Sequence, residues 1–200
     1  MTNTTIKLSI AGLLAAAPVI AQSAGTIRVC TVGGEKTPTL ILLRAQTIAS
    51  RMFATAGVAV EWRSSGDAAC RDASQAGIVS LEFVTGRPDA DHLGALAYAR
   101  PYQGSEIVVM FDRIEHSGIK SSQVSNVLAH SMTHEITHLL QGISRHSETG
   151  VMKAQWRRQD FDQMEYHPLP FTPEDIELIQ RGLARRAVQI ASANGDPDRR

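Results

Sequence analysis

Apolar residues recur every three or four positions in three stretches of this chain, a pattern that predicts three amphipathic helices. The first stretch follows Thr37-Pro38, which resembles an N-cap with proline at the first helical position, and it ends before Gly57. The second runs over residues 122–141 without proline or glycine, and Gly142 follows it. The third begins at Thr172-Pro173 and continues toward residue 193.

Short runs of β-branched and apolar residues lie before and after the first predicted helix and predict strands. These runs are residues 26–32, 58–62, 77–83 and 106–112, with a weaker segment at 93–99 that is expected to be an edge strand. The order strand, helix, strand at the start favours parallel pairing with a right-handed crossover. We therefore predict an α/β (α+β) fold with a mixed, mostly parallel twisted sheet and a C-terminal helix.

The N-terminus differs in kind from the rest of the chain. Lys7 precedes a short apolar run over residues 8–17, and small residues around Ala21 suit a cleavage site there or within the next three residues. The alternative is a membrane anchor, but the run is short for a bilayer span. We predict a signal peptide at 1–24, a single domain at 25–193 and a disordered tail at 194–200. The expected location is secreted or periplasmic.

Charge and cysteine content limit the partners and the redox compartment that we expect for this protein. Twenty basic and 20 acidic residues give no net charge, so no nucleic-acid partner is expected. No second apolar segment follows residues 8–17, so stable membrane insertion after signal cleavage is not expected either. Cys30 and Cys70 are the only cysteines, and an oxidising compartment would favour a disulfide between them. The alternative is a cysteine that caps a metal and keeps the protein latent. We expect a monomer.

The second predicted helix carries the sequence His134-Glu135-Ile136-Thr137-His138. Histidines four positions apart lie one turn apart on the same helix face, so both can aim an imidazole nitrogen at one zinc ion. Glu135 lies between them and can reach a water bound to that ion. Two metal ligands and a carboxylate near the bound water are the minimal set of groups for metal-assisted hydrolysis of a peptide bond.

A catalytic zinc site needs a third protein ligand. His146 is the leading candidate, because the Gly142 break lets the chain turn back toward the helix. Two alternatives stay open: His146 is an ordinary solvated loop residue, or the third ligand is a carboxylate, Glu148 or Glu165.

The site resembles that of the metzincin metallopeptidases, in the matrixin-like pattern. That pattern joins His-Glu-x-x-His to a glycine turn, a third His followed by Ser, and a methionine turn, which here match Gly142, His146-Ser147 and Met152. The match departs from the usual spacing, since the glycine comes one residue late and the third histidine two. The resemblance implies a metzincin-like fold, zinc held by His134, His138 and His146, a Met-turn at Met152, and an edge strand at 93–99 lining a substrate cleft.

These observations predict an exported zinc-dependent endopeptidase acting on protein or peptide substrates. Glu135 is expected to act as the general base, and residues 153–170 are expected to form the wall beside the metal. The alternative is a non-catalytic exported module that binds metal or a protein partner through the same cleft.

Overall fold

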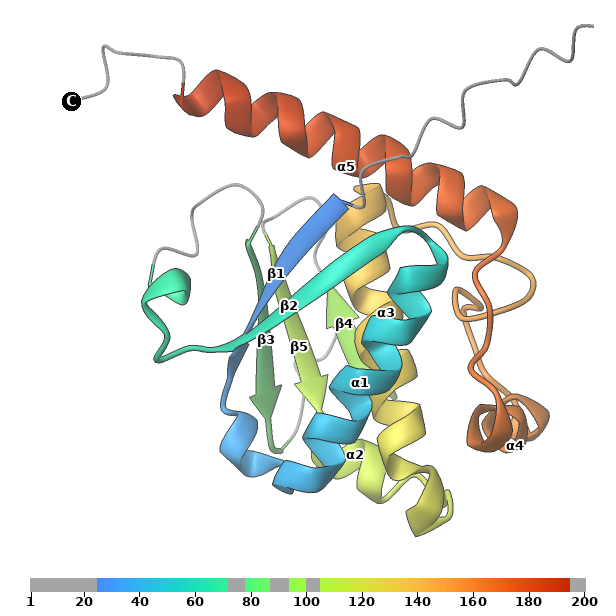
Figure 1. The fold of residues 1–200 in the computed structure, drawn as a ribbon. Helices are drawn as coiled ribbons and strands as arrows, with labels where there is room; N and C mark the ends of the chain where they lie inside the picture. The colour runs from blue at the N-terminus through green and yellow to red at the C-terminus, as the bar shows by residue number, and fades with distance from the viewer. Residues whose placement is uncertain (1–24, 72–77, 87–93, 100–104, 195–200) are drawn as a thin grey trace, which may run out of the picture.

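A computed structural model describes residues 25–71, 78–86, 94–99 and 105–194 (Figure 1). Its strands are β1 Gly25–Val32, β2 Val58–Ser64, β3 Ile78–Val84, β4 Ala97–Ala99 and β5 Glu106–Met110. Its α-helices are α1 Thr39–Thr55, α2 Phe111–Glu115, α3 Val124–Gln141, α4 Arg158–Tyr166 and α5 Pro173–Asn194. The described residues also include the 3₁₀ turns η1 Gly34–Lys36, η2 Ala68–Cys70 and η4 Ser121–Gln123.

The five strands form one sheet in the order β2-β1-β3-β5-β4. The pairs β1–β2, β1–β3 and β3–β5 are parallel, while β4 runs antiparallel to β5 at the edge. The predicted mixed, mostly parallel sheet is therefore confirmed. The edge strand is shorter than predicted, and Leu93 lies outside the described residues.

Helices α1 and α3 lie side by side on one face of the sheet and bury its central side chains (Figure 1). The fully buried set includes Phe53 of α1, Leu81 and Phe83 of β3, Ile107 of β5, and Leu128, Met132 and Ile136 of α3. The core thus lies directly beneath the helix that carries the His-Glu-x-x-His sequence.

Helix α3 is buried on all sides, and Glu135 is its only residue that is more than slightly exposed. On a helical wheel Asn126, Thr133 and Thr137 lie opposite the apolar face of α3, yet all three are buried. Other elements cover that side. Thr133 Oγ1 lies 3.7 Å from Met52 Sδ on α1, and Thr137 satisfies its hydroxyl within the helix by donating to the Thr133 carbonyl.

Two local predictions need correction. Pro38, rather than Thr37, is the N-cap of α1, because the preceding residues close the η1 turn and Thr37 N–H donates to the Gly34 carbonyl. No element was predicted for residues 158–166, but they form α4, where the Arg157 N–H donates to Asp160 Oδ2 at the helix start.

Cys30 in β1 and Cys70 in η2 form a disulfide, with their Cα atoms 5.8 Å apart. The predicted bridge is therefore confirmed, and it leaves no free thiol to cap a metal. Both cysteines cluster with Ile78 in a small satellite core of their own.

Helix α5 crosses the C-terminal end of α3 at very close range. A Cβ built on Gly182 would lie only 1.7 Å from the Leu140 carbonyl oxygen, so no other residue fits there without moving the helices apart. Arg185 Nη2 donates to the Gln141 carbonyl at 2.7 Å, and Arg186 Nη2 donates to the Leu139 carbonyl at 2.8 Å. These arginines satisfy carbonyls that the end of a helix leaves unpaired.

The predicted export signal at 1–24 lies outside the described residues, as does the predicted tail apart from Asn194, which still belongs to α5. Within the described ranges, no helix combines the length and the apolar character needed to cross a bilayer.

Candidate metal centre

The structure brings His134, His138 and His146 together. One ring nitrogen from each lies within 4.8 Å of the others, and the Nε2 atoms of His134 and His138 are 3.0 Å apart. The His146 ring centroid lies 5.2 Å from that of His134 and 4.9 Å from that of His138. The longer loop therefore still returns the third histidine to the helix.

The two helix histidines are fixed by hydrogen bonds from their outer nitrogens. His134 Nδ1 donates to the Val151 carbonyl at 2.9 Å, and His138 Nδ1 donates to the Ile143 carbonyl at 3.1 Å. A carbonyl only accepts, so each Nδ1 carries the proton and each neutral ring presents a bare Nε2 lone pair. Such outer bonds orient metal-binding imidazoles.

Burial keeps these rings neutral. Burial is the largest cause of the shift that lowers the pKa of His134 and of His138 to about 4, and charge repulsion from neighbouring histidines contributes to the same shift. Burial also lowers the pKa of the more exposed His146. Near neutral pH, His134 and His138 are thus in the protonation state that a metal ligand requires.

The loop that carries His146 starts at a left-handed glycine. Gly142 has φ +69° and its N–H donates to the His138 carbonyl at 2.9 Å, so the chain leaves α3 in a sharp turn. A side chain at this φ would be strained. The turn places Ile143 where its carbonyl accepts from His138.

A carboxylate in the last helix holds the same loop from the other side. Asp175, which is fully buried, accepts from Ser147 Oγ at 2.7 Å and from Arg145 Nη1 at 3.2 Å. Its other oxygen accepts from Thr172 N–H and Thr172 Oγ1, at 2.9 and 2.7 Å. The sequence indicated Asp175 only as an early acidic residue of a helix, so its link to the residues flanking His146 was missed.

Met152 lies in a tight turn beside the cluster. Ser147 N–H donates to the Met152 carbonyl at 2.8 Å, and Gly150 adopts φ +77° within the turn. A Cβ on Gly150 would lie 2.2 Å from the Pro170 carbonyl oxygen, so the turn packs tightly against the segment before α5. Met152 is fully buried, and the residue before it supplies the carbonyl that fixes His134.

Glu135 shares a cleft of about 620 Å³ with the three histidines. Burial raises the pKa of its carboxyl to about 7, and a hydrogen bond from the Ala99 backbone N–H of β4 opposes that rise. A carboxyl with a pKa near neutrality can both accept and release a proton.

Edge strand β4 and the segment after the Met152 turn line the cleft. The lining includes residues 94–99 on one side, and Lys153, Ala154, Gln155, Trp156 and Phe161 on the other. The Trp156 ring meets the His134 ring edge-on, with centroids 5.7 Å apart. Of the residues 153–170 that were expected to form the wall, only residues 153–156 and Phe161 contribute to the lining.

Among the described residues, no carboxylate joins the three histidines. Glu148 is exposed, and Glu165 accepts from Lys120, Ser122 and Gln123 at the start of α3. The structure therefore disfavours both as third ligands.

His130 lies one turn before His134 on α3, and it is fully buried and outside the cluster. Its Nδ1 donates to the Asn126 carbonyl, and its Nε2 accepts the Leu169 N–H at 2.9 Å. It thus ties α3 to the segment before α5 and is not a surface residue.

The donor set fits zinc. With both Nδ1 atoms protonated, the 3.0 Å contact between His134 Nε2 and His138 Nε2 joins two lone pairs, which repel unless a cation lies between them. Tetrahedral zinc with ordinary Zn–N bonds holds its nitrogens about 3.3 Å apart. Three neutral imidazoles beside an open cleft would leave one position for water.

Comparison with known proteins shows which solved structures share this fold. No protein-family model matches the chain, and no curated protein sequence matches it. Among solved structures, the archaemetzincin of Methanopyrus kandleri is 18% identical with a TM-score of 0.51, over 84% of this chain and 100% of that one. The chain has the fold of a zinc-dependent peptidase. A peptidase of that description from Methanocorpusculum labreanum is 13% identical, with a TM-score of 0.53 over 76% and 99% of the two chains.

Proposed function

We propose that this protein is a zinc-dependent endopeptidase. The observation that carries the proposal is the paired arrangement of His134 and His138, whose Nδ1 protons point to carbonyls while their Nε2 lone pairs converge with His146. The fold shared with the archaemetzincin and with the zinc-dependent peptidase supports the proposal, as does the presence of Glu135 in the same cleft.

In this proposal His134, His138 and His146 would hold the ion. Zinc bound there would supply an acidified water ligand and polarise a carbonyl oxygen. Glu135 would take a proton from the attacking water and deliver it to the leaving amine. Its pKa of about 7, set by burial, allows both transfers near neutral pH.

Edge strand β4 would position the substrate. It is the last strand of the sheet and lines the cleft, so an extended peptide can pair with its free edge. Main-chain pairing of this kind suits cleavage within a chain rather than at its end. Residues 153–156 would contact the substrate side chains across the cleft.

We also propose that the protein is exported. The signal-like residues 1–24 support this, and so does the Cys30–Cys70 disulfide, since such bridges persist in oxidising compartments.

The test is zinc analysis followed by hydrolysis. We expect one zinc per chain, cleavage of casein that a chelator stops and added zinc restores, and a Glu135→Gln variant that keeps zinc but loses activity by about 100-fold or more. Zinc without cleavage would favour the non-catalytic module. Full activity of Glu135→Gln would refute the assigned base.

A further inference from the structure

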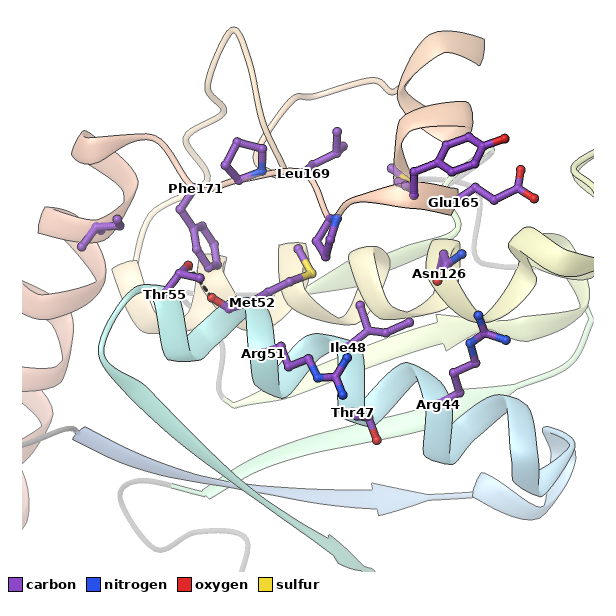
Figure 2. A pocket seen from close by; sticks show the side chains of 15 residues that line it. Arg44, Thr47, Ile48, Arg51, Met52, Thr55, Asn126, Glu165, Leu169 and Phe171 are labelled. Carbon is purple, nitrogen blue, oxygen red and sulfur yellow. Dashed lines mark hydrogen bonds between the residues drawn. The ribbon is translucent and has the colours of Figure 1, made fainter.

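A second cavity lies away from the three clustered histidines, between α1, α3 and the segment leading into α5 (Figure 2). Its volume is about 760 Å³, larger than that of the metal cleft. Apolar side chains make most of its surface. They are Ile48 and Met52 of α1, Met164 of α4, Leu169 and Phe171 after it, and Ile176 of α5. We call this cavity the α1 groove.

Two arginines from α1 lie along the α1 groove (Figure 2). Arg44 and Arg51 are exposed, and neither forms a hydrogen bond or an ion pair with any residue in the described ranges. They are seven positions apart on the helix, which places them about 10 Å apart along its axis. The groove therefore presents two separated, unpaired positive charges.

The acidic residue of the groove does not cancel these charges. Glu165 accepts from Lys120 Nζ at 3.2 Å, Ser122 Oγ at 3.1 Å and Gln123 Nε2 at 3.2 Å, all at the start of α3. The Glu165 carboxylate is thus already paired on its own side of the cavity. The side formed by α1 therefore keeps its positive charge.

Asn126 adds a polar group to the α1 groove. Only 5% of this residue is exposed, it lines the groove, and its side-chain amide makes no hydrogen bond with the part of the chain that the structure describes. The amide atoms are not fully buried, so they reach the space of the groove and can bond to a ligand there.

Exposed apolar residues surround the same place. Leu40 is 81% exposed one turn before Arg44, Leu43 is 53% exposed one turn before Thr47, and Tyr166 is 76% exposed in the lining itself. Apolar surface gathered at the rim of a groove marks a site of interaction.

We propose that the α1 groove binds an apolar peptide segment in the polyproline II conformation, with two acidic side chains three positions apart. Three residues of such a segment rise about 9 Å and return to the same side, so both acidic side chains can face Arg44 and Arg51, which lie about 10 Å apart along α1. Two separate cations favour two anionic groups over the single head group of a fatty acid. That this peptide belongs to a protein substrate, which the groove would hold while the metal cleft cuts elsewhere, rests on the proposed peptidase function.

The test is fluorescence anisotropy with the fluorescein-labelled peptide Gly-Glu-Leu-Phe-Glu-Gly. We expect it to bind at least tenfold more tightly than the Gln-Leu-Phe-Gln analogue, and more weakly as salt is raised. The double variant Arg44→Glu/Arg51→Glu should abolish this preference. Arg71→Glu, a change at another exposed arginine that follows η2 and does not line the groove, should keep it.

Equal binding of the two peptides, or an unchanged preference in the double variant with a native circular dichroism spectrum, would overturn the proposal. So would displacement of the peptide by laurate at lower concentration than by unlabelled peptide. The assay is run with and without chelator. If the peptide still binds in the presence of chelator, and the protein shows no hydrolysis, the groove proposal is supported and only the peptidase function is refuted.

Discussion

Ser147 Oγ lies 2.7 Å from Asp175 Oδ1, which joins the residue after the third histidine to the first turn of the last helix. The same carboxylate accepts from Arg145 on the other side of His146. Hydrogen bonds from both flanking residues to a buried charge restrict where the loop can place the His146 ring.

Replacing Asp175 by Asn should therefore weaken zinc binding. The amide puts an N–H₂ group where donors now converge, so the loop loses part of its anchor. We expect a 10- to 100-fold rise in the zinc dissociation constant, measured by competition with a chromogenic chelator. Glu174→Gln is the control, because it removes only a surface pair with Arg145. Equal zinc affinity in the two variants would contradict the anchoring role.

The disulfide should stabilise the fold without affecting the metal. It closes a loop with a sequence separation of 40, for which the chain-entropy model gives about 4 kcal/mol. We expect Cys30→Ala/Cys70→Ala to lower the free energy of unfolding in urea by about 2–4 kcal/mol. A reducing agent should have the same effect on the wild type and none on the variant. Loss of zinc in the variant would show that the bridge also supports the site.

Gly182→Ala should destabilise the protein, although alanine is the better helix former. In an open helix this change would stabilise by about 1 kcal/mol, but here the new methyl group meets the Leu140 carbonyl. We expect a loss of about 2 kcal/mol or more in thermal or urea unfolding. Gly66→Ala, which meets nothing within 4 Å, is the matched control and should be neutral or slightly stabilising. A stabilised Gly182→Ala would mean that α3 and α5 are not in close contact.

Acid should destabilise the zinc-free protein partly through His130. Burial lowers the pKa of this ring to about 4, below the ordinary value of 6.5, so the unfolded state binds the proton first as the pH falls. The free energy of unfolding should therefore decrease from about pH 6.5 down to about pH 4 and be insensitive to His130 above that window. His134 and His138 contribute in the same direction.

The His130→Gln variant isolates this contribution. Glutamine can still accept the Leu169 N–H but does not titrate, so the difference in unfolding free energy between pH 7.5 and pH 5 should shrink. Both proteins are measured in the presence of chelator. An unchanged difference would show that His130 does not remain neutral in the folded state.

The sequence predicted the elements whose signals are local. Helices α1, α3 and α5 each carry an apolar repeat, and the placement of His134 and His138 on one face follows from helical geometry alone. Helix α4 was missed because Met164 is its only buried residue, and its start depends on a hydrogen bond to Asp160. An apolar repeat cannot report a helix that buries so little.

Long-range features of the site had no local signal. The sequence offered His146 as a candidate but could not show that the loop closes, because closure depends on Asp175, 28 positions after Ser147. Asp175 also exchanges hydrogen bonds with Thr172, as is common for an acidic residue at a helix start. This local role gives no sign of its long-range contact with Ser147. Trp156 lay within the expected wall, but nothing in the sequence placed its ring against His134.

The position of Asp175 also bears on the order in which the molecule matures. The nascent chain emerges with the His-Glu-x-x-His helix well before the final helix, so two imidazoles exist while the loop beyond them still lacks its carboxylate anchor. We expect the chain to bind metal at full affinity only when its synthesis is nearly complete. An incomplete chain would then not yet carry a complete metal site.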